Sequence, residues 1–372
     1  MKPVRWISTP REIDVFGTSH DGGYSHDAVV YALKDCGYRH IDTAKRYGCE
    51  RYIAQAVKAS GVPRQEVFLA TKCWPTDYGA TTTREAFSGS CQRLAVDYLD
   101  MYLLHWPEVS SGVKDKKKLL QETWRTLEVL LDEERVKAIG VSNFLERHLE
   151  IILEECSVTP HVNQCEFHPF NNPKMLRQFC ADRNIQFEGY SPLAKGLALR
   201  DPGVVAIAEA HGRSPAQVLV RWSVQSNVPS IPKSTKLECV RANSQVYDFI
   251  LTQEEMMTLN SMTQTLTCVD RNSMQMKIDN PLPDGYKLNA IPDAFIARPS
   301  PAATTAERGG QSHCYLLQEL NGWLLCLGKY SQLFHALIIQ ELLKTPLDSL
   351  QVICCVILTK MPMPKTGHIF TS

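Results

Sequence analysis

Four polar side chains of the types that transfer protons stand near the ends of apolar segments in the first third of the sequence. Asp42 ends the segment YRHID, Lys72 ends VFLATK, and His105 ends LDMYLLH. Tyr47 follows Asp42 in the segment TAKRYG. A phenol, an ammonium, a carboxylate and an imidazole could together deliver a proton to a reacting oxygen and stabilise the charge that develops on it. The pattern therefore indicates a proton-transfer site.

Each of these residues also has an ordinary structural explanation. An Asp after a strand often caps the next helix, and a Lys is most often a solvated surface charge. A His or a Tyr in such a place can simply pack in the core. Four such residues on adjacent strands, all at the same strand end, are much harder to explain as a coincidence, so we interpret them as one site.

The elements that would position these residues alternate regularly between about residues 15 and 234. Short β-branched or aromatic segments are followed by longer segments with helical periodicity, which is typical of repeated βα units. Eight strands are predicted, at residues 15–18, 39–42, 67–72, 99–106, 137–143, 161–167, 185–191 and 230–233. Helices are predicted at residues 25–36, 82–94, 117–134, 145–155 and 173–182, and from about Pro202 and Ser214 onwards.

Eight strand-helix repeats favour an α/β fold of the closed (β/α)₈ TIM-barrel type over an open, doubly wound sheet. A dinucleotide-binding sheet would be expected to show GxGxxG after its first strand, and no such motif follows any predicted strand. In a barrel, the catalytic groups gather at the carboxyl ends of the strands. The four polar residues meet that condition.

The composition is that of a folded chain without an overall charge. Of its 372 residues, 44% are hydrophobic and 22% charged, with 40 Lys and Arg against 40 Asp and Glu. This balance argues against nucleic-acid or membrane partners and favours a small-molecule ligand. No signal peptide or membrane span is evident, so we expect a cytosolic protein, and a monomer by default. The 13 cysteines show no metal-ligand spacing, so we expect free thiols and no metal.

The character of the sequence changes near its end. We expect the barrel domain to occupy residues 1–290, followed by a segment at 291–313 that is rich in Pro, Ala, Thr and Gly and reads as a linker or a disordered segment. Residues 314–372 form a tail of unknown structure. Its apolar stretches could be helices that pack on the barrel or sequence that finds no partner.

Seven motifs connect the chain to a known family. In their order along residues 15 to about 260 they are GYRHIDTAKRYG, FLATKCW, YLLHWP, IGVSNF, NQCEFHP, GYSPL and IPKS. This series resembles the aldo-keto reductase superfamily. The resemblance implies reduction of aldehyde or ketone carbonyls with NADPH, and a catalytic tetrad at Asp42, Tyr47, Lys72 and His105 with Tyr47 as the proton donor.

Elementary chemistry gives each member of the tetrad a role. A nearby ammonium favours a phenolate, so we expect Lys72 to lower the pKa of Tyr47. Asp42 would hold the Lys72 ammonium by a charge-assisted hydrogen bond. His105, as a neutral donor, would orient the substrate carbonyl. No side chain can supply a hydride, so a cofactor must do so.

The resemblance also implies sites for NADPH or NADP⁺ and for the carbonyl substrate. Tyr190 would stack on the nicotinamide, and Lys233 with Ser234 would bind the ribose phosphate. The cofactor residues expected are Gly17, Thr18, Asp42, Ser142, Asn143, Gln164, Tyr190, Ser191, Leu193, Lys233, Ser234, Thr235 and Asn243. The substrate residues expected are Tyr47, Trp74, His105 and Trp106. Taken singly, several of them are equally explained as helix caps or core residues.

Some positions depart from the family pattern. Cys239 stands where the family usually has an arginine that touches the phosphate, and Ala242 replaces an acidic residue. Arg241 is only two residues from Cys239, but on a helix that shift rotates it by well over a right angle. We expect weaker NADP(H) binding or a looser preference over NAD(H). Ser19 replaces an aromatic wall residue, which predicts a wider or wetter pocket.

The sequence leaves two other functional hypotheses open. One is a nucleotide-binding protein with little or no turnover, which would serve a binding or regulatory role. The other is a non-productive variant whose tail prevents stable folding. The intact tetrad favours the enzyme, whereas the altered phosphate segment keeps the binding protein under consideration. The physiological substrate is not predicted.

Overall fold

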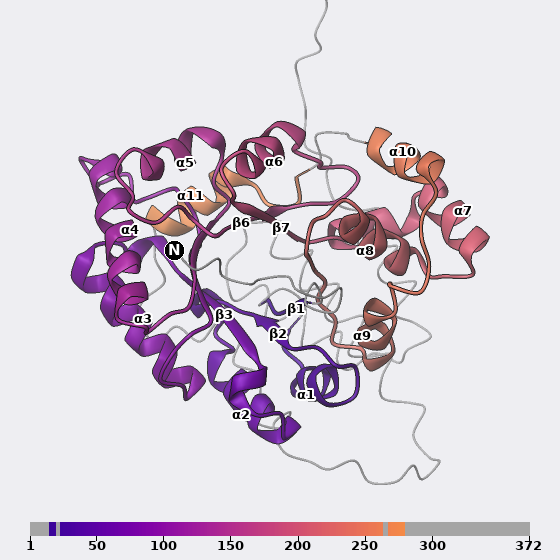
Figure 1. Ribbon diagram of the computed structural model, residues 1–372, viewed down its shortest axis with the longest axis horizontal. Coiled ribbons are helices and arrows are strands. Elements are labelled where there is room, and N and C mark those ends of the chain that lie inside the picture. Colours follow the sequence, from indigo (N-terminus) through magenta and orange to yellow (C-terminus); the bar gives the residue numbers. More distant parts are fainter. Residues whose placement is uncertain (1–14, 20–22, 263–266, 280–372) are drawn as a thin grey trace, which may run out of the picture. The chain divides into compact units, whose positions relative to one another are not determined.

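The computed structural model describes residues 15–19, 23–262 and 267–279, and the structural statements below concern these residues (Figure 1). The predicted linker at 291–313 and the tail at 314–372 lie outside the described residues, as does the end of the predicted barrel domain beyond residue 279. The proposed division into domains therefore stays a prediction.

Eight parallel strands form one sheet in which each strand pairs with the next one along the chain. They are β1 (Val15–Gly17), β2 (His40–Asp42), β3 (Phe68–Cys73), β4 (Met101–Leu104), β5 (Ile139–Ser142), β6 (Val162–Glu166), β7 (Gln186–Tyr190) and β8 (Ser230–Ile231). All eight predicted strands are present, although most are shorter than expected. Their residues are almost all buried, as in parallel sheets whose two faces are both covered.

The first and last strands meet and close the sheet. The Gly17 N–H donates to the Pro232 carbonyl at 3.0 Å. A side chain at Gly17 would collide there, because an added Cβ would lie 2.7 Å from the Ile231 side chain and 3.2 Å from its backbone oxygen. Glycine is therefore required at this seam by close packing. The predicted (β/α)₈ barrel is confirmed.

Helices surround the strands (Figure 1). They are α1 (His26–Lys34), α2 (Glu50–Ser60), α3 (Ala80–Leu94), α4 (Lys116–Asp132), α5 (Glu146–Leu153), α6 (Lys174–Ala181), α7 (Pro202–His211), α8 (Pro215–Gln225), α9 (Leu237–Ser244), α10 (Gln253–Ser261) and α11 (Arg271–Asp279). The predicted helices are confirmed within a few residues. Helices α2, α9, α10 and α11 were not in that list.

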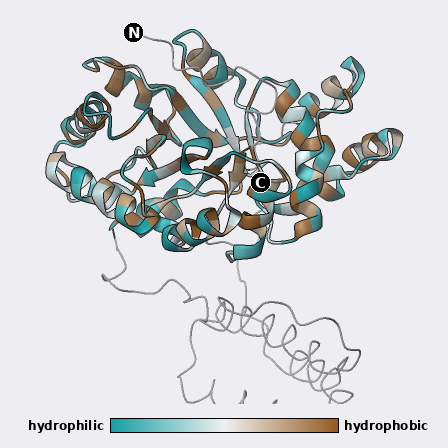
Figure 2. Cartoon of the chain, turned by 60° about the horizontal axis from the view of Figure 1, so that its bottom comes forward, coloured by the Kyte–Doolittle hydropathy of each residue, from teal (hydrophilic) through white to brown (hydrophobic). Residues whose placement is uncertain are grey.

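Helix starts follow the capping residues in the sequence. The side chains of Ser25, Asp115, Asp201 and Ser214 each accept a backbone N–H of the following first turn, in α1, α4, α7 and α8. Figure 2 shows brown and teal residues alternating along the helices, as expected of helices with one buried stripe. Among the described helices, none combines the length and the apolar character needed to cross a bilayer.

The largest hydrophobic cluster lies between the strands and the helices. Trp124 and Trp222 are fully buried in it, and the Trp222 ring stacks on Phe167 with the centroids 4.5 Å apart. The buried polar side chains include several at the carboxyl ends of the strands, among them Asp42, Lys72 and His105. Burying charged groups is costly unless they are paired, so this end of the barrel is the place to expect a functional site.

Candidate active site

A buried ion pair lies at the carboxyl ends of β2 and β3. Asp42 is the last residue of β2, and Lys72 is the next-to-last residue of β3. The Lys72 ammonium donates to Asp42 Oδ1 at 2.5 Å and to the Thr43 carbonyl at 2.9 Å. Burial alone would lower the pKa of Lys72, but Asp42 and Tyr47 raise it, and the net direction is upward. Lys72 therefore stays charged although its side chain is only 1% exposed.

Tyr47 lies beside this pair, on the short 3₁₀ helix η2 (Lys45–Tyr47) that follows β2. The Lys72 ammonium is 5.3 Å from the centre of the Tyr47 ring. Burial raises the pKa of the Tyr47 phenol, whereas the charge and hydrogen bond of Lys72 lower it. Lys72 therefore acts in the expected direction, but the net pKa is raised because Lys72 offsets only part of the cost of charging a buried phenol.

His105 completes the group, directly after β4. Its ring packs edge-on against Tyr47, with the centroids 5.6 Å apart, and against Trp74, at 5.3 Å. Trp74 follows β3, and Trp106 follows His105. The indoles of Trp74 and Trp106 are both buried. The phenol, the imidazole and two apolar walls thus come from three consecutive strand ends.

One pocket of about 580 Å³ collects these side chains. Of the predicted site residues, it is lined by Gly17, Thr18, Asp42, Tyr47, Trp74, His105, Trp106, Ser142, Asn143, Gln164, Tyr190, Ser191, Leu193 and Lys233. Ser234, Thr235 and Asn243 are not among its lining residues, and Lys72 lies behind Asp42. Ser19, which stands where many members of the family have an aromatic residue, also lines the pocket. Residues that were not predicted are Arg46, Pro192, Lys195, Gly196, Ile231, Val269, Met274 and Lys277.

Asn143 connects three strand ends on the far wall. Its backbone has a φ of 64°, a left-handed conformation that asparagine tolerates better than most residues. Its Nδ2 donates to the His105 carbonyl at 3.0 Å, and its Oδ1 accepts the Tyr190 hydroxyl at 2.7 Å. The positions of the His105 backbone and the Tyr190 ring are therefore coupled through one amide.

Gln164 connects the catalytic pair to a carboxyl group that was not predicted. Its Nε2 donates to Asp42 Oδ2 and to Glu188 Oε2, both at 2.9 Å. Glu188 is buried in β7, and burial, followed by the charge of Asp42, raises its pKa to about 7. Both N–H bonds of the amide are thus engaged inside the barrel, so Gln164 can offer only its oxygen to a ligand.

The segment after β8 differs from the expected phosphate site. Lys233 lines the pocket, whereas Cys239 on α9 is exposed. Arg241 lies against α1, where its Nε donates to the Tyr31 hydroxyl at 2.6 Å. Asn243 is buried, and no described residue donates to its Oδ1. Arg241 therefore does not replace the arginine missing at Cys239.

The last wall of the pocket comes from the segment around α11. Met274 and Ile278 of α11 pack with Val269 against Trp74 and Trp106. Two charged groups hold this segment in place. Arg271 pairs with Glu108 at 2.5 Å and donates to the Asn143 carbonyl. Residues that follow the last of the motifs along the chain thus cover the two indoles.

Glu166, at the end of β6, is the second charged group that holds the segment around α11 in place. Its Oε1 accepts the Cys268 N–H at 2.6 Å and the His168 ring at 2.8 Å, and its Oε2 accepts the Val269 N–H at 3.2 Å. The ligand atoms of Glu166, His168 and Cys268 lie within 4.8 Å of one another, a juxtaposition that spacing in the sequence did not reveal. Because N–H donors occupy both carboxylate oxygens, we interpret the group as a clamp on the backbone of this segment.

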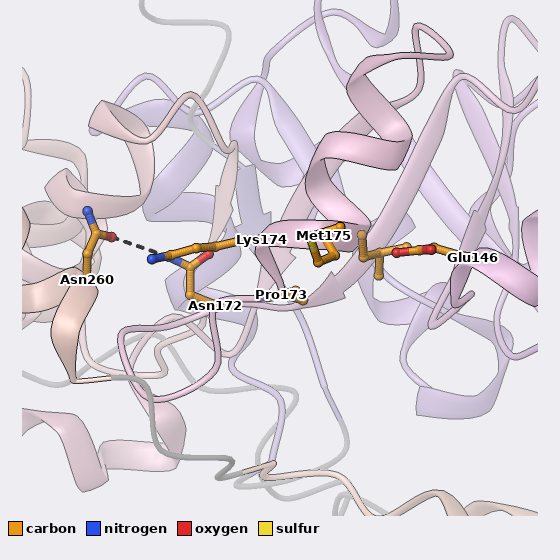
Figure 3. Close-up of a pocket in the computed structure, with 7 residues that line it drawn as sticks. Glu146, Asn172, Pro173, Lys174, Met175 and Asn260 are labelled. Atoms are coloured by element: carbon orange, nitrogen blue, oxygen red, sulfur yellow. Dashed lines mark hydrogen bonds between the residues drawn. The ribbon is translucent and has the colours of Figure 1, made fainter.

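A second pocket of about 460 Å³ lies between the starts of α5 and α6 and the end of α10 (Figure 3). It is lined by Glu146, Asn260 and residues 172–176, and the Asn172 amide donates to Asn260 Oδ1 at 3.3 Å. It shares no lining residue with the first pocket and contains no cluster of proton-transfer groups. The candidate active site is therefore the pocket at the strand ends.

Comparison with known proteins agrees with this geometry. The model of the aldo/keto reductase family matches residues 16–264. An uncharacterized oxidoreductase of Caenorhabditis elegans is 47% identical over 292 residues, which cover 78% of this chain and 90% of the relative. Glyoxal reductase of Bacillus subtilis is 43% identical over 244 residues, covering 66% and 85%. The chain therefore belongs to the aldo/keto reductase family.

A solved structure adds information on the cofactor of a relative. The Bombyx mori aldo-keto reductase in complex with NADP has 28% sequence identity and a TM-score of 0.65, covering 70% of this chain and 92% of that one. Family membership makes this chain an oxidoreductase of the carbonyl-reducing class, and members of this class use nicotinamide cofactors.

Proposed function

We propose that this protein reduces aldehyde or ketone carbonyls to alcohols with NADPH, and that Tyr47 is the general acid. The observation that carries the proposal is the meeting of Tyr47 and His105 in one pocket, beside the buried Lys72–Asp42 pair. A phenol and an imidazole can both reach a single carbonyl oxygen there, while the cation stabilises the charge that proton transfer leaves behind.

The residues present fit a nicotinamide dinucleotide. The partly exposed Tyr190 ring lines the pocket and could stack on a flat ring, and Lys233 offers a cation to a phosphate. The Asn243 oxygen is a buried acceptor without a described donor, and an amine of the adenine ring would satisfy it. Ser142, Asn143 and Gln164 would hold the carboxamide. When bound, NADPH supplies the hydride.

The raised pKa of Tyr47 suits a proton donor. At neutral pH the phenol is protonated, so the proton is in place before the reaction begins. As the carbonyl oxygen gains charge, Tyr47 donates its proton to that oxygen and becomes a phenolate. Lys72 stabilises the phenolate, and Asp42 keeps Lys72 charged and fixed.

The alternative function is nucleotide binding with little or no turnover. The exposed Cys239 and the engagement of Arg241 with Tyr31 support it, because they remove an expected phosphate contact. That change bears on cofactor affinity, and it leaves the tetrad intact. The enzyme is therefore the better supported of the two, and the cytosolic location and monomeric state expected from the sequence stay predictions.

The test follows the loss of NADPH absorbance with a reactive aldehyde such as glyoxal. Tyr47→Phe removes only the hydroxyl, and we expect turnover to fall by about 10²- to 10⁴-fold with NADPH binding nearly unchanged. Tyr98→Phe is the matched control, since this tyrosine precedes β4 and does not line the pocket. Turnover that survives in Tyr47→Phe would contradict the mechanism. NADPH binding by the wild type without any turnover would favour the alternative.

A further inference from the structure

Arg46 lines the active-site pocket and has no charged partner among the described residues. It lies on η2, between Lys45 and Tyr47, and is one of the pocket-lining residues. Its guanidinium carbon is 5.2 Å from the centre of the Trp74 ring. No described residue forms a hydrogen bond or an ion pair with it, and burial lowers its pKa with no described carboxylate acting against that effect. A half-buried guanidinium usually has an anion beside it.

Neighbouring cations contrast with Arg46. The Lys45 ammonium donates to both oxygens of Asp77, at 2.9 and 2.8 Å. Arg271, at the opposite wall, is paired with Glu108. Lys45 and Arg271 are thus each neutralised by a carboxylate of the protein. The N–H donors of Arg46, which faces the pocket, have no such acceptor among the described residues.

The pocket as a whole is cationic. Among its described lining residues, the only carboxylate is Asp42, and the cations are Arg46, Lys195, Lys233 and Lys277. Asp42 is already committed to Lys72. Lys233 and Lys195 belong to the segments after β8 and β7, where we expect the phosphates of the cofactor. Arg46 and Lys277 remain, and both lie on the side of the pocket formed by Trp74 and α11.

Trp74 connects Arg46 to the reacting centre. One indole contacts the guanidinium and, 5.3 Å away by centroids, the His105 ring. A carbonyl held by Tyr47 and His105 could therefore extend its chain along the indole, with its other end at Arg46. A short chain that ends in an oxyanion would fill this path, and a guanidinium binds carboxylate or phosphate through two parallel hydrogen bonds.

We propose that Arg46 is an anion-binding residue of the substrate site, and that this enzyme prefers short carbonyl compounds carrying an oxyanion a few atoms from the carbonyl. The proposal rests on the proposed function and adds the substrate class. It concerns a residue beside the general acid, and it predicts selectivity for a negative charge among short substrates.

The experiment compares two short aldehydes of which only one carries a negative charge, succinic semialdehyde and its methyl ester. For the wild type with NADPH, we expect kcat/KM for the acid to exceed that for the ester. In Arg46→Gln we expect the acid-to-ester ratio of kcat/KM to fall by about 10- to 100-fold, through the KM of the acid, as for loss of hydrogen bonds to a charged group. Arg46→Lys should keep part of the ratio, because it retains the charge but loses the planar fork.

Lys45→Gln is the matched control. It removes one positive charge from the neighbouring residue, whose ammonium is bound to Asp77 and does not line the pocket. The ratio should stay at the wild-type value. Glyceraldehyde and its phosphate ester, tested in the same way, distinguish the source of the oxyanion: a larger drop for one pair identifies carboxylate or phosphate as the preferred group.

The outcomes separate the two proposals. A wild type that reduces both aldehydes with the same kcat/KM, or an Arg46→Gln ratio equal to that of the wild type, overturns the anion site and leaves the proposed function standing. If the wild type reduces neither aldehyde, the proposed function fails. The anion site is then decided by titrating tryptophan fluorescence of the NADP⁺ complex, in which succinic semialdehyde should saturate the wild type at concentrations that leave Arg46→Gln unsaturated. Equal titrations would overturn it.

Discussion

The two sides of the active-site pocket are built in different ways. On one side, the protein itself supplies partners for the charged groups of the tetrad: Asp42 binds Lys72, and Gln164 bridges Asp42 and Glu188. After β8, Lys233 faces the pocket, while Cys239 is exposed and Arg241 is held by Tyr31. The first side is organised before a ligand arrives, whereas the second lacks the arginine that the family usually has at Cys239. Substitutions of the tetrad residues should therefore affect folding and turnover, and a substitution at Cys239 only nucleotide affinity.

The largest expected effect on stability comes from breaking the buried ion pair. Lys72→Met leaves the Asp42 carboxylate buried without its cation, and we expect the free energy of unfolding to fall by about 3–5 kcal/mol. Urea unfolding followed by circular dichroism measures the change. Adding Asp42→Asn should recover part of the loss, because no buried charge then remains unpaired.

An exposed ion pair supplies the control for that comparison. Arg84 and Glu133 pair across α3 and the end of α4, with both side chains more than 40% exposed. Arg84→Met should cost far less than Lys72→Met, since water screens the charge that is left. Equal losses in the two variants would show that the catalytic side is not held together by its buried pair.

The next effect concerns Glu188, whose pKa is about 7 against an ordinary value of 4.5. Between these two pH values the folded chain holds a proton that the unfolded chain has lost, so the free energy of unfolding falls as pH rises through this window. Glu188→Gln removes that dependence. The variant should be more stable than the wild type by up to about 3 kcal/mol at pH 8, with no gain below pH 4.

Glu166 provides a control of opposite sign. Burial acts to raise its pKa, but the hydrogen bonds of His168 and of the Cys268 N–H outweigh burial and lower it. Its contribution to stability is therefore present above the ordinary pKa of a glutamate and is lost as pH falls. Glu166→Gln should destabilise the protein at pH 8. A Glu188→Gln variant whose difference from the wild type is the same at pH 4 and pH 8 would contradict the buried-carboxyl interpretation.

The smallest expected effect is on the second side. Cys239→Arg restores a guanidinium at an exposed position of α9, and we expect NADPH to bind about tenfold more tightly, as for one added charge-assisted hydrogen bond. NADH, which lacks the ribose phosphate, should change less. Fluorescence titration with both nucleotides measures this. Arg241→Gln should leave both affinities unchanged, and equal tightening for NADPH and NADH would remove this account of the site.

Most of the barrel could be predicted from local patterns. The eight strands are short apolar segments bounded by polar residues, and helices such as α4 and α8 start at capping residues that the sequence displays. Helix α2 was not predicted, although Tyr52, Ile53 and Ala56 form an apolar stripe with helical spacing. Helix α11 has a weaker pattern, with Ile278 as its one fully buried residue, and its place depends on contacts with distant strand ends.

The catalytic group was predictable for a related reason. Residues at the carboxyl ends of adjacent parallel strands must lie close together, so the positions of Asp42, Lys72 and His105 in the sequence already imply their proximity. Arg46, Lys277 and the Glu166 clamp were not predictable in this way. Their roles depend on which loop folds over the pocket, and the periodicity of hydrophobic residues does not predict how a loop folds. The direction of the Tyr47 pKa also required the degree of burial.

The closure between Gly17 and Pro232 also has a consequence for synthesis on the ribosome. Each strand from β2 onwards can add to the one made just before it, but β1 must wait for its second neighbour until β8 has emerged. Until then the nascent sheet has two open edges that could pair with other chains. A chain whose synthesis stops before β8 would therefore have an open, aggregation-prone sheet, even if all its other strands and helices form.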